Sequence, residues 1–203
     1  MRLRAAAVTT PIRSVCIYCA SSSQADAEYL DSARRLGSLL AERGIEIVYG
    51  GGAVGLMGAL ADGALASGGK VVGVLPQFMV DLEWGHTGIT KLHVVDDLHT
   101  RKRMMIRGAD AVIALPGGSG TLEELLEAIT WKRLGLIVAP IVIVSVRGFY
   151  ASLVDLLEHC IRENFMRSQH AEMWSVVDSI EDVLPAIERA PRWSTDARSF
   201  ATL

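Results

Sequence analysis

Residues 109–124 read Ala-Asp-Ala-Val-Ile-Ala-Leu-Pro-Gly-Gly-Ser-Gly-Thr-Leu-Glu-Glu, and this stretch decides the fold. Its first part, residues 109–115, is a short apolar run that predicts a buried β-strand. Residues 121–134 repeat apolar side chains at nearly helical spacing and predict an α-helix. The glycine-rich residues 116–120 lie between the two. We therefore predict a strand that turns sharply and leads directly into a helix.

The same alternation of strand and helix runs along the rest of the chain. Several apolar runs have no polar position at all, which fits strands buried on both faces of a parallel sheet. With right-handed crossovers, this pattern predicts an α/β fold: a doubly wound, Rossmann-like parallel sheet with helices on both faces. The predicted strands are residues 14–20, 45–49, 70–75, 91–95, 109–115, 140–146 and 174–177. The predicted helices are residues 25–43, 55–67, 98–108, 121–134, 149–164 and 180–190.

A length of 203 residues suits a single domain. We expect a flexible N-terminus over residues 1–12, one Rossmann-like domain over 13–190 and a loose C-terminal tail over 191–203. Ligands of such sheets bind beyond the carboxyl ends of the strands. We expect the irregular segment 80–88 to form a mobile loop over the site. The loops of interest are residues 21–24, 50–55, 76–88, 96–99, 116–120 and 147–148.

Composition excludes several classes of protein. A net charge of −3 gives no basic excess for a nucleic-acid partner. No apolar run reaches the roughly 18–20 residues that cross a membrane. Cys16 and Cys19 could form a redox pair or half of a metal site, but three residues apart on a strand they face opposite sides. We favour two buried side chains, expect Cys160 to be in the core, and expect a cytoplasmic protein.

The turn and helix start at residues 116–124 combine an anion-binding seat with acids. Unpaired N–H groups and the helix dipole favour phosphate at such a position. Glu123 and Glu124 are poor neighbours for a bare phosphate, which indicates chemistry on a phosphorylated substrate. A purely structural interpretation stays open, because Thr121 and Glu124 have the spacing of a capping box.

A second glycine loop follows the second predicted strand. Gly50, Gly52 and Gly55 match the dinucleotide fingerprint, but the next strand ends Val74-Leu75-Pro76 without the acid that binds ribose, so NAD binding is disfavoured. Two interpretations stay open: the glycines permit a tight turn and close helix packing, or their N–H groups also line a ribose or phosphate pocket. A Walker loop is excluded, because no Gly-Lys-Ser/Thr follows either cluster.

A basic cluster, His99-Thr-Arg-Lys-Arg103, lies at the start of the helix predicted over 98–108. Basic side chains oppose the dipole there, which indicates an anionic ligand or a carboxylate partner. A solvated basic face is the alternative. The residues that follow, Met104, Met105 and Ile106, are expected in the core.

Taken together, Arg101-Lys102 and the Pro-Gly-Gly-Ser-Gly-Thr-Leu-Glu-Glu run resemble the LOG ("lonely guy") family of cytokinin-activating phosphoribohydrolases. The family motif is Pro-Gly-Gly-x-Gly-Thr-x-x-Glu, and Ser119 takes its variable position. Residues 50–58, 73–76 and 128–131 also look like the family. The resemblance covers roughly residues 14–190.

The resemblance implies an enzyme that hydrolyses the N-glycosidic bond of an N6-modified adenosine 5′-monophosphate to free base and ribose 5-phosphate, with AMP as a further substrate. It implies that Arg101 and Glu124 are catalytic. It implies no metal or organic cofactor, a small-molecule nucleoside 5′-monophosphate as the ligand, and a homodimer with the site near its interface. The residues implied in substrate binding are Glu83, Lys102, Gly117, Gly118, Ser119, Gly120, Thr121, Leu122, Glu123 and Thr130, together with Gly51 and Gly52 of the second loop.

Two other functions were weighed. A non-catalytic carrier of a nucleotide or nucleotide-like cofactor would need the glycine loops but not the Arg101–Glu124 pair, so the presence of both favours the enzyme. A pyridoxal-dependent lysine decarboxylase is disfavoured, because nothing around Lys102 or Lys132 resembles a pyridoxal site.

Overall fold

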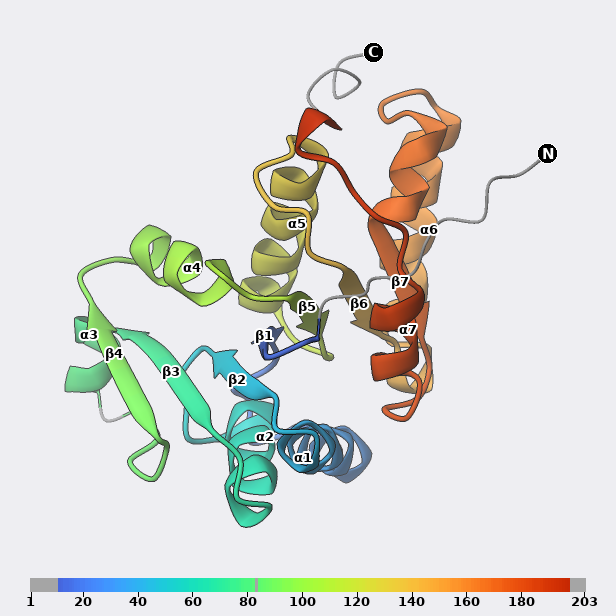
Figure 1. Cartoon of the computed structure of the whole chain (residues 1–203). Coiled ribbons are helices and arrows are strands. Elements are labelled where there is room, and N and C mark those ends of the chain that lie inside the picture. The colour runs from blue at the N-terminus through green and yellow to red at the C-terminus, as the bar shows by residue number, and fades with distance from the viewer. Residues whose placement is uncertain (1–10, 83, 198–203) are drawn as a thin grey trace.

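A computed structural model describes residues 11–82 and 84–197 and shows one seven-stranded sheet (Figure 1). The strand order is β4-β3-β2-β1-β5-β6-β7, and neighbouring strands pair in parallel. The predicted doubly wound α/β fold is confirmed. The strands are β1 (Ser14–Tyr18), β2 (Glu46–Tyr49), β3 (Val71–Pro76), β4 (Lys91–Val95), β5 (Ala111–Ala114), β6 (Ile141–Val144) and β7 (Trp174–Val177).

Helices connect the strands, and each helix predicted from the sequence is present, with ends that differ by up to three residues. The structure adds one helix, α3, within residues 76–88, which the sequence had indicated as an irregular loop. The helices are α1 (Ala27–Glu42), α2 (Gly55–Ala66), α3 (Gln77–Asp81), α4 (Leu98–Ile106), α5 (Ser119–Arg133), α6 (Ala151–Arg162) and α7 (Val183–Arg189). Short 3₁₀ turns occur at Val146–Gly148, Ser168–Met173 and Thr195–Ala197.

The sheet separates two hydrophobic cores, because successive strand side chains point to opposite faces. On one face Ile47 and Ile113 pack with residues of α1, α2 and α7, and on the other Val112 packs with residues of α4, α5 and α6. Cys16 belongs to the second core and Cys19 to the first, and both are free thiols. This confirms that the two cysteines are buried and unpaired.

Two expectations about packing were wrong. Met104 is 38% exposed, because the helix α4 directs it to solvent, whereas Met105 and Ile106 enter the core. Cys160 is only half buried.

In the expected loose tail, the indole Nε1–H of Trp193 donates to the Lys132 carbonyl at 2.7 Å, and Ala197 is fully buried. Residues 191–197 therefore pack against the end of α5.

The strand order reverses between β1 and β5, so the chain leaves these adjacent strands in opposite directions. The loops after the two strands diverge and leave a crevice at the carboxyl edge of the sheet, where ligands of doubly wound folds bind. At the base of the crevice the Ala20 N–H donates to the Pro116 carbonyl at 3.2 Å. Both glycine loops reach this crevice.

Candidate active site

A cavity of about 510 Å³ occupies the crevice. Its walls come from the loops after β1, β2, β3 and β5 and from the first residues of α5, so four of the six loops indicated by the sequence contribute to it. The lining residues are Cys19, Ala20, Ser21, Ser22, Gly50, Gly52, Val54, Met57, Leu75, Met79, Trp84, Arg101, Gly118, Ser119, Gly120, Thr121 and Glu124.

The start of α5 forms one end of this cavity. Gly118 is the N-cap and Ser119 the first helical residue, and no described side chain caps the helix. The capping box proposed for Thr121 and Glu124 is therefore wrong: Thr121 is already inside the helix, and Glu124 lies in its second turn. With no acid in the first turn, the free N–H groups are available to an anion.

Arg101 and Glu124 form a buried ion pair beneath the cavity. The Arg101 Nη1 donates to the Glu124 Oε1 at 2.7 Å, and the two residues are 8% and 4% exposed. The guanidinium also donates from Nε to the Val74 carbonyl at 3.0 Å and from Nη2 to the Gly50 carbonyl at 3.3 Å. These three bonds fix the side chain in one orientation.

Burial raises the pKa of the Glu124 carboxyl above its usual range, and the charge of Arg101 opposes the shift. The result is a carboxyl group that takes up a proton more readily than an exposed glutamate, next to a fixed cation. Such a group can stabilise developing positive charge or activate water.

The residue Gly50 makes the approach of Arg101 possible. A Cβ at this position would lie 2.1 Å from the Arg101 Nη2. Gly52 lines the cavity, and its carbonyl accepts a hydrogen bond from the Tyr49 hydroxyl at 3.1 Å. Gly51 lies behind it and faces the segment at residues 84–88. The second glycine loop thus has both of the roles left open by the sequence: it allows close packing and it lines a pocket.

Lys102 lies outside the cavity wall, in the seam between α4 and α5. Its Nζ pairs with the Glu123 carboxylate and, at 3.2 Å, with the Glu127 Oε2. Partial burial lowers the pKa of Lys102, but the hydrogen bonds to the two glutamates outweigh it and raise the pKa overall. The basic cluster thus has the carboxylate partners that the sequence indicated.

The remaining predicted residues are distributed as follows. Gly118, Ser119, Gly120 and Thr121 line the cavity, whereas Gly117 and Leu122, which flank them in the chain, do not. Thr130 is exposed, away from the cavity, and its hydroxyl donates to the Leu126 carbonyl at 2.8 Å. Glu83 lies outside the described residues.

Sequence reasoning missed the apolar end of the cavity. Val54, Met57, Leu75, Met79 and Trp84 are its apolar lining, contributed by α2, β3 and the loops after β2 and β3 rather than by α5. Trp84 and Val54 are 54% and 53% exposed, so both present apolar surface to the cavity that a bound ligand could cover. The sequence had indicated only that the segment 80–88, which contains Trp84, lies over the site.

The floor of the cavity includes the Cys19 thiol, which is 1% exposed. Burial raises the pKa of this thiol well above its usual range, so it is not a thiolate nucleophile. No group of three or more His, Cys, Asp or Glu side chains suited to a metal ion occurs within residues 11–82 and 84–197.

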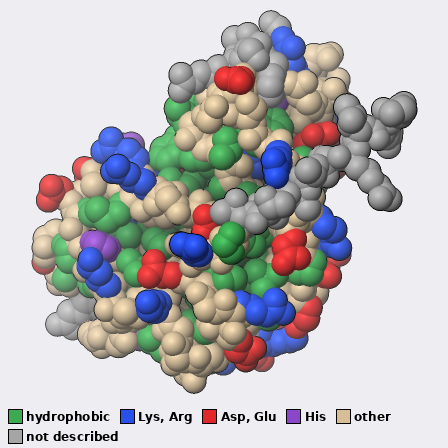
Figure 2. Space-filling model, in the orientation of Figure 1, with side chains coloured by type: hydrophobic (Ala, Val, Ile, Leu, Met, Phe, Trp, Pro, Cys, Tyr) green, Lys and Arg blue, Asp and Glu red, His purple; other side chains and the backbone are tan. Residues whose placement is uncertain are grey.

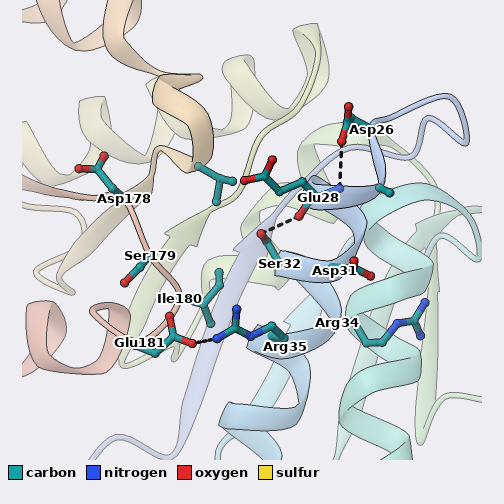
Figure 3. Close-up of a pocket in the computed structure, with 12 residues that line it drawn as sticks. Asp26, Glu28, Asp31, Ser32, Arg34, Arg35, Asp178, Ser179, Ile180 and Glu181 are labelled. Carbon is teal, nitrogen blue, oxygen red and sulfur yellow. Dashed lines mark hydrogen bonds and ion pairs between the residues drawn. The ribbon is translucent and has the colours of Figure 1, made fainter.

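A second hollow, of about 760 Å³, lies between the start of α1 and the loop after β7 (Figure 3). Two of its charged side chains have partners: Arg35 pairs with Glu181, and Asp26 pairs at 3.0 Å with Arg147, which lies outside the lining. The helix that borders this hollow, α1, is capped by the Asp26 side chain, so its first N–H groups are not all free. The acids that line the hollow are exposed, in contrast to Glu124. The crevice between β1 and β5 is therefore the better candidate.

A doubly wound sheet with a free helix start and a buried Arg–Glu pair at its switch point defines the class of Rossmann-like nucleotide-binding proteins. A family model described as "possible lysine decarboxylase" matches residues 57–187. The chain is 42% identical over 180 residues to the cytokinin riboside 5′-monophosphate phosphoribohydrolase of Rhodococcoides fascians, covering 88% of this chain and 90% of the relative. It is 36% identical over 189 residues to one from Arabidopsis thaliana, covering 90% and 89%. The chain belongs to the LOG family of phosphoribohydrolases.

Solved structures with the same fold include a molybdenum cofactor carrier protein of Chlamydomonas reinhardtii, with a TM-score of 0.69, 19% identity and coverage of 89% of this chain and 98% of that one. A molybdenum cofactor binding protein of Rippkaea orientalis gives a TM-score of 0.63, 22% identity and coverage of 88% and 97%. At these identities the likeness shows the fold alone. Within the described residues, no helix is both long and apolar enough to span a membrane.

Proposed function

We propose that this protein hydrolyses the N-glycosidic bond of N6-modified adenosine 5′-monophosphates, the cytokinin nucleotides, to free base and ribose 5-phosphate, and that it also accepts AMP. The observation that carries the proposal is the buried Arg101–Glu124 pair beside the free start of α5. The named activity of the relatives supports it.

The chemistry follows from the order of groups along the cavity. A 5′-phosphate at the N–H groups of Ser119, Gly120 and Thr121 would place the ribose over Glu124 and the base toward the apolar end. Cleavage of the glycosidic bond builds positive charge on the ribose, and a nearby carboxylate stabilises that charge or activates water, as in glycoside hydrolysis. Arg101 holds the carboxylate in place. The proposed steps use no metal or organic cofactor.

The other residues have supporting roles in this proposal. Gly117 and Gly118 shape the turn that presents the phosphate seat, and Gly51 and Gly52 close the cavity from the β2 side. Lys102 acts at a distance, because its pairs with Glu123 and Glu127 hold α4 against α5. Leu122 and Thr130 do not line the cavity and make no contact with the nucleotide in this proposal, whereas Glu83, outside the described part of the chain, stays a proposed substrate-binding residue.

The rival function is a non-catalytic carrier of a nucleotide-like cofactor, as in the molybdenum cofactor carrier protein that has the same fold. Burying the Glu124 carboxylate carries a desolvation cost, which the charge of Arg101 has to offset. A carrier that only binds its ligand gains nothing from such a pair. The pair therefore favours hydrolysis.

The test is to incubate the protein with AMP and with isopentenyl-AMP and to follow free base by chromatography. We expect Glu124→Gln to lower kcat by about 10³-fold, the usual effect of removing one transition-state stabiliser, while nucleotide binding is retained. Glu158→Gln is the control, because Glu158 lies exposed on α6 with only the Arg162 pair. Release of no base by the wild type would refute the enzyme, and full activity of Glu124→Gln would remove Glu124 from catalysis.

We also propose a homodimer that covers the surface of α4 and α5. Leu98 and Met104 of α4 are 46% and 38% exposed, and Leu126 and Leu134 of α5 are 40% and 39% exposed. Figure 2 shows hydrophobic side chains gathered between these two helices. Because α4 carries Arg101 and α5 carries Glu124, such an interface would lie close to the site. Light scattering on the purified protein tests this: a monomer at micromolar concentration contradicts it.

The cytoplasm is the proposed location. All three cysteines are free thiols, as is usual in a reducing compartment. Fractionation of cells that express the protein would test this.

A further inference from the structure

The segment at residues 84–88 is bound edge to edge to the second glycine loop. Gly52 and Gly85 form an isolated antiparallel bridge. The Ala53 N–H donates to the Trp84 carbonyl at 3.0 Å, and the His86 N–H donates to the Gly51 carbonyl at 2.9 Å. The two segments are therefore joined by backbone hydrogen bonds, and together they form one wall of the cavity.

A histidine anchors this wall to α2. The His86 Nδ1 accepts the Gly88 N–H at 3.0 Å, so in the neutral ring the proton is on Nε2, which lies 3.2 Å from the Asp62 Oδ1 and donates to it. The His86 side chain is only 14% exposed, whereas that of Asp62 is 56% exposed. Asp62 sits on α2, a helix whose opposite face is part of the core, so the bond ties the wall to a rigid element.

The wall in turn supports the catalytic pair. Gly51 is held by the His86 N–H, and the adjacent Gly50 carbonyl accepts from the Arg101 Nη2 at 3.3 Å. Arg101 then binds Glu124. Asp62 thus binds the His86 side chain, the His86 backbone binds Gly51, and the neighbouring Gly50 binds Arg101. Through these contacts Asp62 is linked to the Glu124 carboxylate.

We propose that His86, held by Asp62, is a positioning residue for the reaction: it fixes the wall formed by residues 50–53 and 84–88, and through the Gly50 carbonyl it fixes the orientation of Arg101. His86 is not among the residues that line the described cavity, so it acts through the wall and does not contact the nucleotide. The kinetic part of this inference rests on the proposed hydrolysis, whereas the conformational part does not.

The experiment compares His86→Ala, Asp62→Ala and the double variant in the full-length protein. We expect each single variant to lower kcat/KM for AMP and for isopentenyl-AMP about fivefold, which corresponds to about 1 kcal/mol, the usual net contribution of one hydrogen bond. The double variant should lose no more than either single one, because both changes remove the same bond. Hydrogen exchange of peptides that contain Ala53 should be about fivefold faster in all three.

Two variants separate positioning from general loss of structure. His86→Gln keeps an N–H donor near the Nε2 position and should recover most of the wild-type kcat/KM. Arg34→Ala removes the only other described ion pair of Asp62, at 4.0 Å, and should leave kcat/KM unchanged.

The proposal is overturned by unchanged exchange at Ala53 in His86→Ala, by unchanged kcat/KM in that variant, or by additive losses in the double variant. If the wild type releases no base, the proposed hydrolysis fails, and the exchange measurement alone decides whether His86 and Asp62 hold the wall. A faster exchange in His86→Ala that His86→Gln reverses then supports the conformational part.

Discussion

Replacing Arg101 with methionine tests how the buried pair is held. The variant keeps an unbranched apolar stem but removes the guanidinium, which leaves the Glu124 carboxyl, 4% exposed, without its cation. Breaking a buried ion pair by removing one partner costs about 3–5 kcal/mol. With an m-value of about 2 kcal/mol/M, a loss of about 3 kcal/mol at pH 8 lowers the urea midpoint by about 1.5 M.

The loss should depend on pH in a defined direction. Burial already raises the pKa of Glu124 and Arg101 opposes the shift, so removing Arg101 raises that pKa further. A carboxyl group with a higher pKa in the folded state binds more protons there, and stability falls as the pH rises from its unfolded value through its folded value. The variant loses more over this range than the wild type. The deficit should therefore be largest at pH 8 and smaller at pH 5.

The assay is urea unfolding of wild type and Arg101→Met at pH 5 and pH 8. Arg103→Met is the matched control: the same substitution on the same helix, at an exposed side chain whose guanidinium reaches only the Thr100 hydroxyl at 3.4 Å. It should change stability by less than about 0.5 kcal/mol. An Arg101→Met deficit that is equal at both pH values would refute the account, because Glu124 would not then carry a buried charge.

Two further predictions concern α5. Lys132 is 1% exposed, and burial lowers its pKa from 10.5 to about 8. Keeping the buried side chain charged therefore costs the folded state about 3 kcal/mol. The Trp193 ring, whose centroid lies 5.8 Å from the Lys132 Nζ, offsets about 1 kcal/mol of this cost. Lys132→Met should therefore gain about 2 kcal/mol at pH 7 in urea unfolding. The gain should shrink from pH 8 toward pH 10.5, where the unfolded lysine also loses its proton; a variant no more stable than wild type at pH 7 contradicts this. A Cβ on Gly117 would lie 2.1 Å from the Thr121 Oγ1, so Gly117→Ala should lower the free energy of unfolding by about 1–3 kcal/mol. A Cβ on Gly120 would have nothing within 4 Å, so Gly120→Ala should leave the melting temperature unchanged or slightly higher. Equal melting temperatures for these two variants would show that the turn has room for the added methyl group.

The fold could be predicted because its signals are local. The β6 run Ile141–Val144 is buried at every position, and such uninterrupted apolar runs occur only in strands covered on both sides. Helix α3 escaped prediction, because five residues give too short a window for a helical period. Met104 was misplaced because α4 has apolar residues at adjacent positions, and only packing decides which of them faces the sheet.

The candidate site could be predicted in part. The glycine loops and the Arg101 and Glu124 side chains were found through motifs. The capping box was wrong, although Thr121 and Glu124 have the right spacing for one. The helix begins earlier, at Ser119, so Thr121 is inside it and cannot be its N-cap. Trp84 could not be placed, since its contribution to the cavity depends on the bridge between Gly52 and Gly85.

The order of strands and helices, the turn at residues 116–120 and the charged groups of the site could all be identified from the chain alone, because they depend on residues close together in it. The contacts of Arg101 with Glu124 and of Lys102 with Glu123 and Glu127, and the outward position of Thr130, follow from packing. These pairings join α4 to α5 across β5, and a partner is chosen by the direction in which each helix presents its side chains after packing on the sheet. The spacing of residues along the chain does not indicate that direction.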